Sequence, residues 1–225
     1  GRTEAEIEET IMDLILTQGN PTIALLARPG YIALRVTAKA ETAEAAYALM
    51  SPLVTELRKR LPVADYHIEQ HVREDLVVLL EKTHLSISAA ESCTGGLLTS
   101  RLTDVPGSSA YVMGSVVSYT NEVKVDFVGV EKKTLAAHGA VSKETACQMA
   151  EGIRKVMHTD FGVGITGIAG PDGGTPQKPV GLVYIAVAGP DRTAVKKNRF
   201  TGTRKQIKFQ TTQTALDMLR RMLAE

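Results

Sequence analysis

From about residue 85 onward, short apolar segments rich in β-formers alternate with longer segments that have helical spacing. Strands are expected near residues 85–89, 111–119, 160–166, 180–188 and 193–200, and helices near residues 97–102, 122–127, 132–137, 142–156 and 205–223. Strands that alternate with helices form mainly parallel sheets covered on both faces. Because Gly189-Pro190-Asp191 predicts a hairpin between the last two strands, the fold class should be α/β, a three-layer α/β/α sandwich with a mixed sheet.

The preceding segment predicts a separate small α+β unit over residues 1–70, with the larger unit spanning 71–225. Thr3-x-x-Glu6 is a capping-box pattern that begins a helix. A turn at Pro29-Gly30, a strand from Tyr31 to Ala38 and a helical pattern around Pro52 follow. A short strand near residues 65–68 and a helical run over 72–82 complete the expected elements. The helix-strand-helix order is compatible with a KH-like fold.

The composition excludes several classes of protein. A formal net charge of +1 provides no overall field to attract nucleic acid, and the first unit has no Gly-x-x-Gly loop of the kind that nucleic-acid-binding KH domains use. A structural or dimer-forming module is therefore expected there. No apolar run is long enough for a membrane helix. With only two cysteines and no secretion signal, the expected location is the cytoplasm.

The turn Ser92-Cys93-Thr94-Gly95-Gly96 lies between an expected strand and an expected helix. Loops at strand ends form the ligand crevice of an open α/β sheet, and glycines let an anion approach backbone N–H groups. The sequence favours two interpretations about equally. Either this turn is a binding site, or Ser92 or Thr94 only caps the following helix.

A serine needs a nearby base to act as a nucleophile. None of the five histidines is well placed. The better candidate is Tyr119-x-Asn121-x-x-Lys124, which follows a strand and could face Ser92 if a helix begins at Asn121. A lysine acts as a base only when its pKa is lowered, and Lys124 could instead be a solvated lysine on a short helix.

Gly162-x-Gly164-x-x-Gly167 matches the dinucleotide-binding fingerprint by letter only. It lies within an expected strand, and Ile168 to Gly174 cannot begin the helix that the fingerprint requires. A glycine-rich loop from Thr166 to Lys178 that supplies backbone amides to a ligand is the better interpretation.

Near the entry to the last helix, Arg204 is suited to pair with a phosphate or carboxylate, whereas Lys205 and Lys208 are expected to be solvated. Cys93 is expected to be a buried, unreactive thiol. No cluster of histidine, cysteine and carboxylate residues has zinc-ligand spacing, so neither a metal nor a cofactor is expected.

Taken together and in order, the motifs resemble the CinA family: a nicotinamide-nucleotide amidase domain preceded by a KH-type domain. The stretches that carry the resemblance are Ala90 to Gly96, Leu102 to Ser109, Tyr119 to Lys124, His138 to Ser142, Thr166 to Gly174, Lys178 to Gly181 and, in the first unit, Asn20 to Thr22 and Leu34 to Ala40. Long members of the family begin with a molybdopterin-binding-like domain, and this chain has no initial methionine. We therefore expect it to be part of a longer, fused protein.

The resemblance implies hydrolysis of the carboxamide of nicotinamide mononucleotide to nicotinate mononucleotide and ammonia, a step of pyridine nucleotide recycling. It places the catalytic residues on Ser92, Tyr119 and Lys124. The substrate contacts that it implies fall on Thr94, Gly95, Gly96, Asn121, Thr166, Gly167 and Arg204.

Several alternatives stay open from the sequence. Either Tyr119 or Lys124 could be the immediate base. A non-catalytic nucleotide-binding or sensor module would keep the phosphate contacts without the reaction. A homodimer is expected from the short strands and the apolar first helix.

Overall fold

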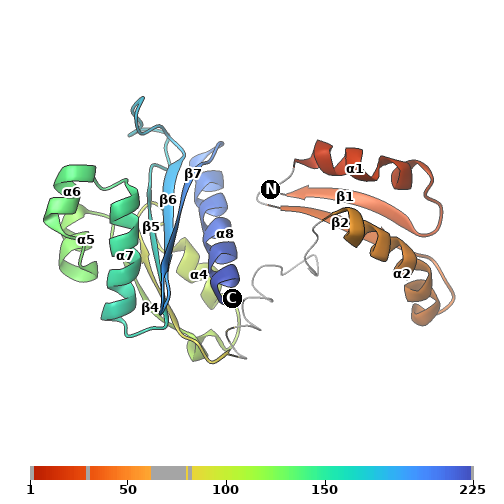
Figure 1. The fold of residues 1–225 in the computed structure, drawn as a ribbon, viewed down its shortest axis with the longest axis horizontal. Coiled ribbons are helices and arrows are strands. Elements are labelled where there is room, and N and C mark those ends of the chain that lie inside the picture. The colour runs from red at the N-terminus through yellow and green to blue at the C-terminus, as the bar shows by residue number, and fades with distance from the viewer. Residues whose placement is uncertain (1–2, 29–30, 62–79, 81–82, 224–225) are drawn as a thin grey trace. The chain divides into compact units, whose positions relative to one another are not determined.

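The computed structural model describes residues 3–28, 31–61, 80 and 83–223 (Figure 1). The chain divides into two compact units, Gly1–Ile68 and Glu69–Glu225. The expected turn at Pro29-Gly30, the strand near 65–68 and most of the helical run over 72–82 lie outside the described residues. Among the described helices, none combines the length and apolar character needed to cross a membrane.

The first unit is a β-hairpin with two helices. Its elements are α1 (Glu4–Leu16), β1 (Thr22–Arg28), β2 (Tyr31–Thr37) and α2 (Ala43–Arg60), with β1 antiparallel to β2. The Thr3–Glu6 capping box begins α1 as expected, and α2 runs through Pro52. β1 was not expected from the sequence, because Ile23 to Ala27 are apolar without alternation. Its inward residues complete a small core around Ile11 and Leu57.

The second unit contains a five-stranded mixed sheet, as the sequence predicts, in the order β4-β3-β5-β6-β7. β3, β4 and β5 are mutually parallel, and β6 and β7 complete the sheet in antiparallel pairs. The strands are β3 (Ile87–Glu91), β4 (Val112–Val117), β5 (Phe161–Gly167), β6 (Leu182–Ala188) and β7 (Thr193–Arg199).

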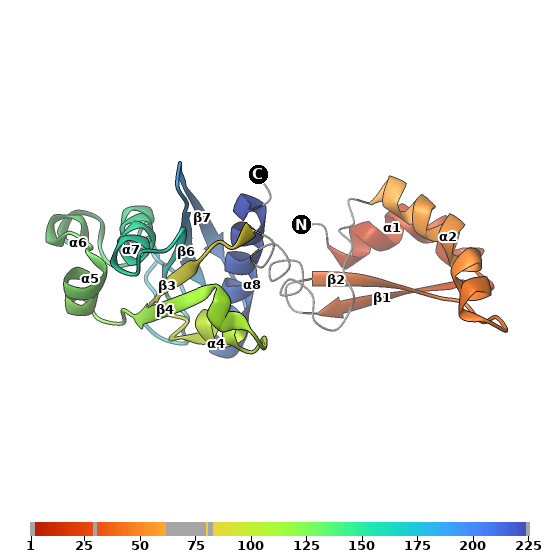
Figure 2. The same cartoon turned by 90° about the horizontal axis from the view of Figure 1, so that it is seen from below.

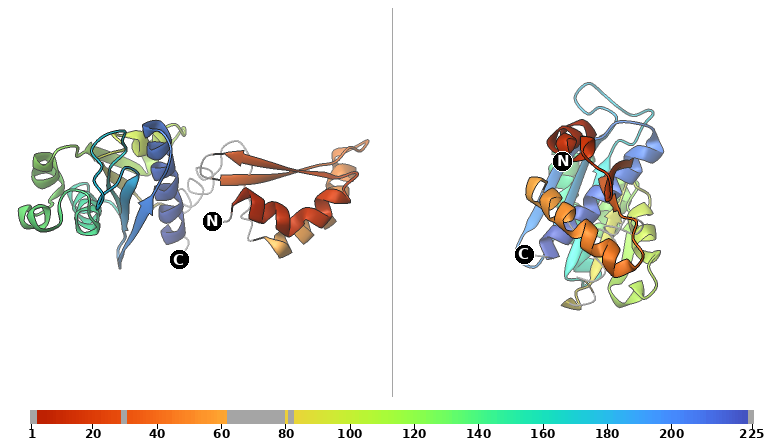
Figure 3. Two further views of the ribbon diagram at one scale, coloured as in Figure 1. Left: turned by 90° about the horizontal axis from the view of Figure 1, so that it is seen from above. Right: turned by 90° about the vertical axis from the view of Figure 1, so that its right-hand side faces the viewer.

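Helices cover both faces of this sheet, which confirms the three-layer sandwich. Figures 1 and 2 show α4 and α8 on one face and α5, α6 and α7 on the other, and Figure 3 repeats the arrangement from further directions. The helical elements are α4 (Leu97–Thr103), the short 3₁₀ helix η1 (Ser108–Ala110), α5 (Asn121–Val128), α6 (Lys132–His138), α7 (Lys143–Val156) and α8 (Arg204–Leu223).

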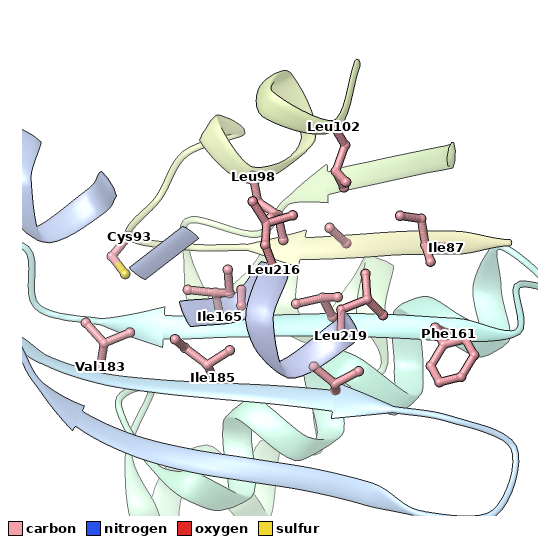
Figure 4. Close-up of a cluster of buried hydrophobic side chains, with 14 of the residues drawn as sticks. Ile87, Cys93, Leu98, Leu102, Phe161, Ile165, Val183, Ile185, Leu216 and Leu219 are labelled. Carbon is pink, nitrogen blue, oxygen red and sulfur yellow. The ribbon is translucent and has the colours of Figure 1, made fainter. Parts of the chain in front are cut away.

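The two faces of the sheet pack differently. Large aliphatic residues fill the space beneath α4 and α8, among them Leu98, Ile165 and Leu216 (Figure 4). On the other face α7 approaches β5 closely, because β5 carries glycine at 162 and 164. A Cβ atom on Gly164 would lie 2.5 Å from the backbone nitrogen of Ala150. The fingerprint-like glycines therefore serve helix–sheet packing, in agreement with the rejection of a dinucleotide site.

The topology gathers several loops at one edge of the sheet. β3, β4 and β5 are parallel, so their carboxyl ends at Glu91, Val117 and Gly167 meet there. β7 runs in the same direction as β5, because both are antiparallel to β6. It therefore delivers the start of α8, at Arg204, to the same edge. This edge is where a ligand crevice is expected in an open α/β sheet.

A glycine in α7 provides a test of the packing. An alanine inside a helix is normally more favourable than glycine by about 1 kcal/mol. At Gly152, however, the added Cβ would overlap the carbonyl oxygen of Val128, the last residue of α5. We expect Gly152→Ala to destabilise the fold by about 1–3 kcal/mol, measured by urea unfolding.

The matched control for this substitution is Lys155→Ala, at an exposed position of the same helix. This control should stay within about 0.5 kcal/mol of the parent chain. A stabilised Gly152→Ala chain would contradict the close contact between α7 and the end of α5.

Candidate active site

The Ser92–Gly96 segment forms a tight turn between β3 and α4. The Ser92 N–H donates to the Ile165 carbonyl at 3.0 Å, which holds the start of the turn against β5. Gly95 and Gly96 have φ values of +60° and +90°, a left-handed conformation that favours glycine. The Gly95 N–H returns to the Ser92 carbonyl at 3.1 Å. The two glycines are thus needed for the reversal of the chain.

Glu91, rather than Ser92 or Thr94, caps α4. Its side chain is 0% exposed, and its two carboxylate oxygens accept from the N–H groups of Leu98 at 3.0 Å and Thr99 at 2.9 Å. The Thr99 hydroxyl adds a bond at 2.8 Å. This result decides against the helix-cap interpretation of Ser92. This role could not be predicted from the local pattern, because the carboxylate reaches the helix from before the turn, outside the usual N-cap position.

Lys124 is buried beside Ser92. Its side chain is 1% exposed, and its Nζ lies 3.2 Å from Ser92 Oγ. The same Nζ donates to the carbonyls of Ser118 at 2.7 Å and Tyr119 at 3.2 Å. α5 begins at Asn121, as expected, with Thr120 as its N-cap. The end of β4 and the first turn of α5 therefore direct the lysine inward, which excludes the solvated alternative.

The burial of Lys124 also changes its acid–base behaviour. Removal from water penalises the ammonium form and so lowers the pKa of Lys124. The acidic groups of Cys93 and Glu122 act in the opposite direction, but the net shift is downward. A larger fraction of this side chain is thus the neutral amine, which can accept a proton, than for a lysine in water.

Tyr119 lies at the rim of the site and pairs with Arg204. Its side chain is 58% exposed, and its hydroxyl is 3.1 Å from Arg204 Nη2. Arg204 Nη1 donates to the Gly170 carbonyl at 2.7 Å. Within the described chain, no hydrogen bond joins the Tyr119 hydroxyl to Ser92. The structure thus brings Ser92 and Lys124 together, and holds Tyr119 with Arg204 beside them.

The remaining expected contacts form the walls of the site. Thr166 is buried and donates to the Ala140 carbonyl at 2.7 Å, which attaches the loop before α7 to the end of β5. Gly167 allows close approach to β6, since a Cβ there would lie 2.7 Å from the Leu182 carbonyl oxygen. Asn121 is exposed in the first turn of α5. The loop beyond Gly167 is held to the end of α6 by Lys178 Nζ, which donates to the His138 carbonyl at 2.7 Å.

Lys208 is less exposed than the sequence led us to expect. Lys208 is half-buried, and its Nζ lies 3.6 Å from the point that a Cβ atom on Gly95 would occupy. Lys205, by contrast, is exposed as expected. The four-residue spacing between Arg204 and Lys208 is a signal that could have been used, because such residues share one face of a helix.

Arg101 fastens α4 to α8 and so helps to place Lys208. Its guanidinium donates to Thr212 Oγ1 at 2.6 Å and Gln213 Oε1 at 2.7 Å. It also lies 4.6 Å from the centre of the Phe209 ring. The helix that carries Lys208 is therefore held directly against the helix that follows the Ser92 turn.

Two further expectations concern the chemistry of the site. Burial raises the pKa of Cys93 to about 12, so its thiol stays protonated near neutral pH and is a poor nucleophile. In the part of the chain that the structure describes, no three histidine, cysteine or acidic residues are grouped as they would be around a metal ion.

Two protein-family models match the chain. The CinA C-terminal domain covers residues 69–223, and the damage-inducible protein CinA KH domain covers residues 1–66. The chain belongs to the CinA family. This CinA chain is 47% identical to a putative competence-damage inducible protein from Moorella thermoacetica and 48% identical to a CinA-like protein from Dictyoglomus thermophilum. Each alignment covers 99% of this chain and 54% of the relative, so the chain spans about half the length of these relatives.

Solved structures of related proteins resemble this chain over about 70% of its length. The competence/damage inducible protein CihA from Agrobacterium tumefaciens is 39% identical, with a TM-score of 0.65 over 72% of this chain and 100% of that chain. A CinA superfamily protein from Klebsiella pneumoniae is 31% identical, with a TM-score of 0.66 over 68% and 96% of the two chains. The names of these relatives refer to competence and damage and state no reaction.

The Glu91 cap provides a test of how the turn is held. In Glu91→Gln, an amide NH₂ group must face backbone N–H donors, which leaves a buried donor without an acceptor. We expect a loss of about 1–3 kcal/mol in the free energy of unfolding, measured by urea denaturation. Asp191→Asn, an exposed carboxylate in the β6–β7 turn, serves as the control and should be neutral. Equal stability of the two variants would contradict the capping role of Glu91.

Proposed function

We propose that the CinA-type unit hydrolyses the carboxamide of nicotinamide mononucleotide to nicotinate mononucleotide and ammonia. The observation that carries the proposal is the buried contact of 3.2 Å between Lys124 Nζ and Ser92 Oγ. It pairs a potential nucleophile with an amine whose pKa is lowered by burial, the arrangement that an activated serine requires. The choice of substrate comes from the resemblance to nicotinamide-nucleotide amidases of the family.

In this proposal Ser92 Oγ attacks the amide carbon while neutral Lys124 takes the hydroxyl proton. The tetrahedral adduct then loses its amino group, which accepts the proton from Lys124 and leaves as ammonia. Water attacks the resulting ester, and Lys124 takes a proton from that water. The proton passes to Ser92 Oγ as the ester bond breaks, and the carboxylic acid product ionises in water.

The oxyanion of each adduct needs donors that are not already used. In the turn, the N–H groups of Gly95 and Leu97 bond to carbonyls of the turn itself, and those of Leu98 and Thr99 bond to Glu91. The N–H groups of Thr94 and Gly96 form no hydrogen bond with any described residue. We assign the oxyanion to these donors.

We assign the role of base to Lys124 and a substrate-orienting role to Tyr119. The lysine contacts Ser92 Oγ directly, whereas the tyrosine hydroxyl contacts Arg204 at the rim. An exposed aromatic ring beside the turn is suited to contact the flat pyridine ring of the substrate. Thr166 and Gly167 then act by shaping the wall, and Asn121 is available to the ribose.

The first experiment measures ammonia release from nicotinamide mononucleotide by the wild-type chain and by Ser92→Ala and Lys124→Met. Loss of the base should lower kcat by about 10²–10⁴-fold, and loss of the nucleophile by up to about 10⁶-fold. Lys132→Met, an exposed lysine on α6, is the matched control and should keep full activity. Full activity of Ser92→Ala would rule out the covalent route. Nucleotide binding without ammonia release by the wild-type chain would favour a non-catalytic sensor module.

The pH dependence tests the role of Lys124 separately. Only the neutral amine can accept the Ser92 proton, so kcat/KM should rise with pH through the pKa of Lys124 and then level off. The negative charge of Glu122 raises that pKa. Glu122→Gln should therefore move the rising limb to lower pH, and Glu131→Gln should leave it unchanged. A limb that moves to higher pH in Glu122→Gln would contradict the assignment of Lys124 as the base.

A further inference from the structure

Lys208 is a partly buried cation beside the Ser92 turn. Within the described chain, no acidic residue forms a salt bridge with it. Its Nζ approaches Gly95, and no salt bridge or hydrogen bond to another described residue engages it. Its neighbour one helical turn earlier differs, since Arg204 donates to both Gly170 and Tyr119. Both partners of Arg204 are uncharged, but they fix its guanidinium at the rim, whereas no described residue bonds to the Lys208 ammonium.

The turn next to Lys208 offers a matching polar group. The open N–H groups of Thr94 and Gly96 are assigned to the oxyanion of the reaction, so they are not counted for a second anion. The Thr94 hydroxyl is completely buried and also lacks a partner. Buried polar groups are normally satisfied. A half-buried cation and an unpaired hydroxyl on the two sides of Gly95 have the character of a site for an anion that the protein binds from outside.

The acidic residue nearest in sequence to this turn does not neutralise Lys208. Both oxygens of the Glu91 carboxylate are occupied by the N–H groups at the start of α4 and by the Thr99 hydroxyl. The Arg101 clamp holds α8 against α4, so Lys208 is kept beside the turn without an anionic partner. An ammonium held half-buried in this way gains most from a ligand that supplies the missing negative charge.

We infer that Lys208 is the specificity-determining residue that binds the phosphate of the substrate and so selects a phosphorylated amide over the unphosphorylated nucleoside. The inference rests on the proposed function for the reaction, but adds a residue and a role to it. Glycine at position 95 is favoured by its φ of +60°, and the absence of a side chain there leaves the Lys208 ammonium open toward the turn. Arg204 then acts at the rim, through Tyr119 and the Gly170 loop.

The decisive experiment compares two substrates, nicotinamide mononucleotide and nicotinamide riboside, with the wild-type chain and Lys208→Met. We expect kcat/KM for the mononucleotide to fall about 10- to 100-fold, as expected for loss of a hydrogen bond to a charged group. The riboside value should change less than about twofold. Lys205→Met, the exposed lysine on the same helix, should leave both values unchanged, and Lys208→Arg should recover part of the loss. An equal fall for both substrates would overturn the inference.

A binding measurement separates this inference from the proposed reaction. Titration calorimetry with Ser92→Ala and with Ser92→Ala combined with Lys208→Met requires no turnover. Weaker binding of the mononucleotide by the double variant, with unchanged binding of the riboside, supports the phosphate site even if no ammonia is released by the wild-type chain. Equal affinity of the two variants for the mononucleotide overturns it. Circular dichroism confirms that each variant is folded before these values are compared.

Discussion

The buried Glu91 carboxylate is the interaction on which the candidate site depends. A charge with no exposure must be fully satisfied, and this one accepts two backbone N–H groups and one hydroxyl at the start of α4. It thereby joins the end of β3 to the helix across the turn between them. The turn is held at both ends, and Ser92 keeps its hydroxyl free for Lys124 instead of using it as a helix cap.

The second buried charge follows from the arrangement of the parallel strands. β4 ends beside β3, so the first turn of α5 begins next to Ser92 and turns Lys124 inward among the carbonyls of residues 118–120. Those carbonyls satisfy the donors of the lysine, while removal from water lowers its pKa. The same burial that costs stability therefore prepares a base, a compromise common at functional sites.

The third part of the site comes from the far end of the chain. β7 returns to the same edge of the sheet, and α8 places Arg204 and Lys208 there, more than 110 residues after Ser92 in the sequence. Arg101 holds the two helices together. Under the proposed function, one side of the turn carries out the amide chemistry and the other recognises the anionic group, so that both depend on the geometry of residues 92–96.

The order of most elements, the mixed sheet and the turn at Ser92 could be predicted from the sequence, because they follow from local periodicity, glycine positions and chain order. The resemblance to the family could also be recognised from the sequence, because its motifs are continuous stretches of residues. The folded structure was needed to show that Glu91 is the cap, that Lys124 lies against Ser92, and that Arg204 is bonded to Gly170 and Tyr119 while Lys208 is not bonded to any described residue. Local sequence pattern could not reveal these contacts, since each joins residues on different elements and depends on burial. The fingerprint-like glycines of β5 were the clearest case: their spacing suggested a nucleotide loop, and their purpose is the close approach of α7.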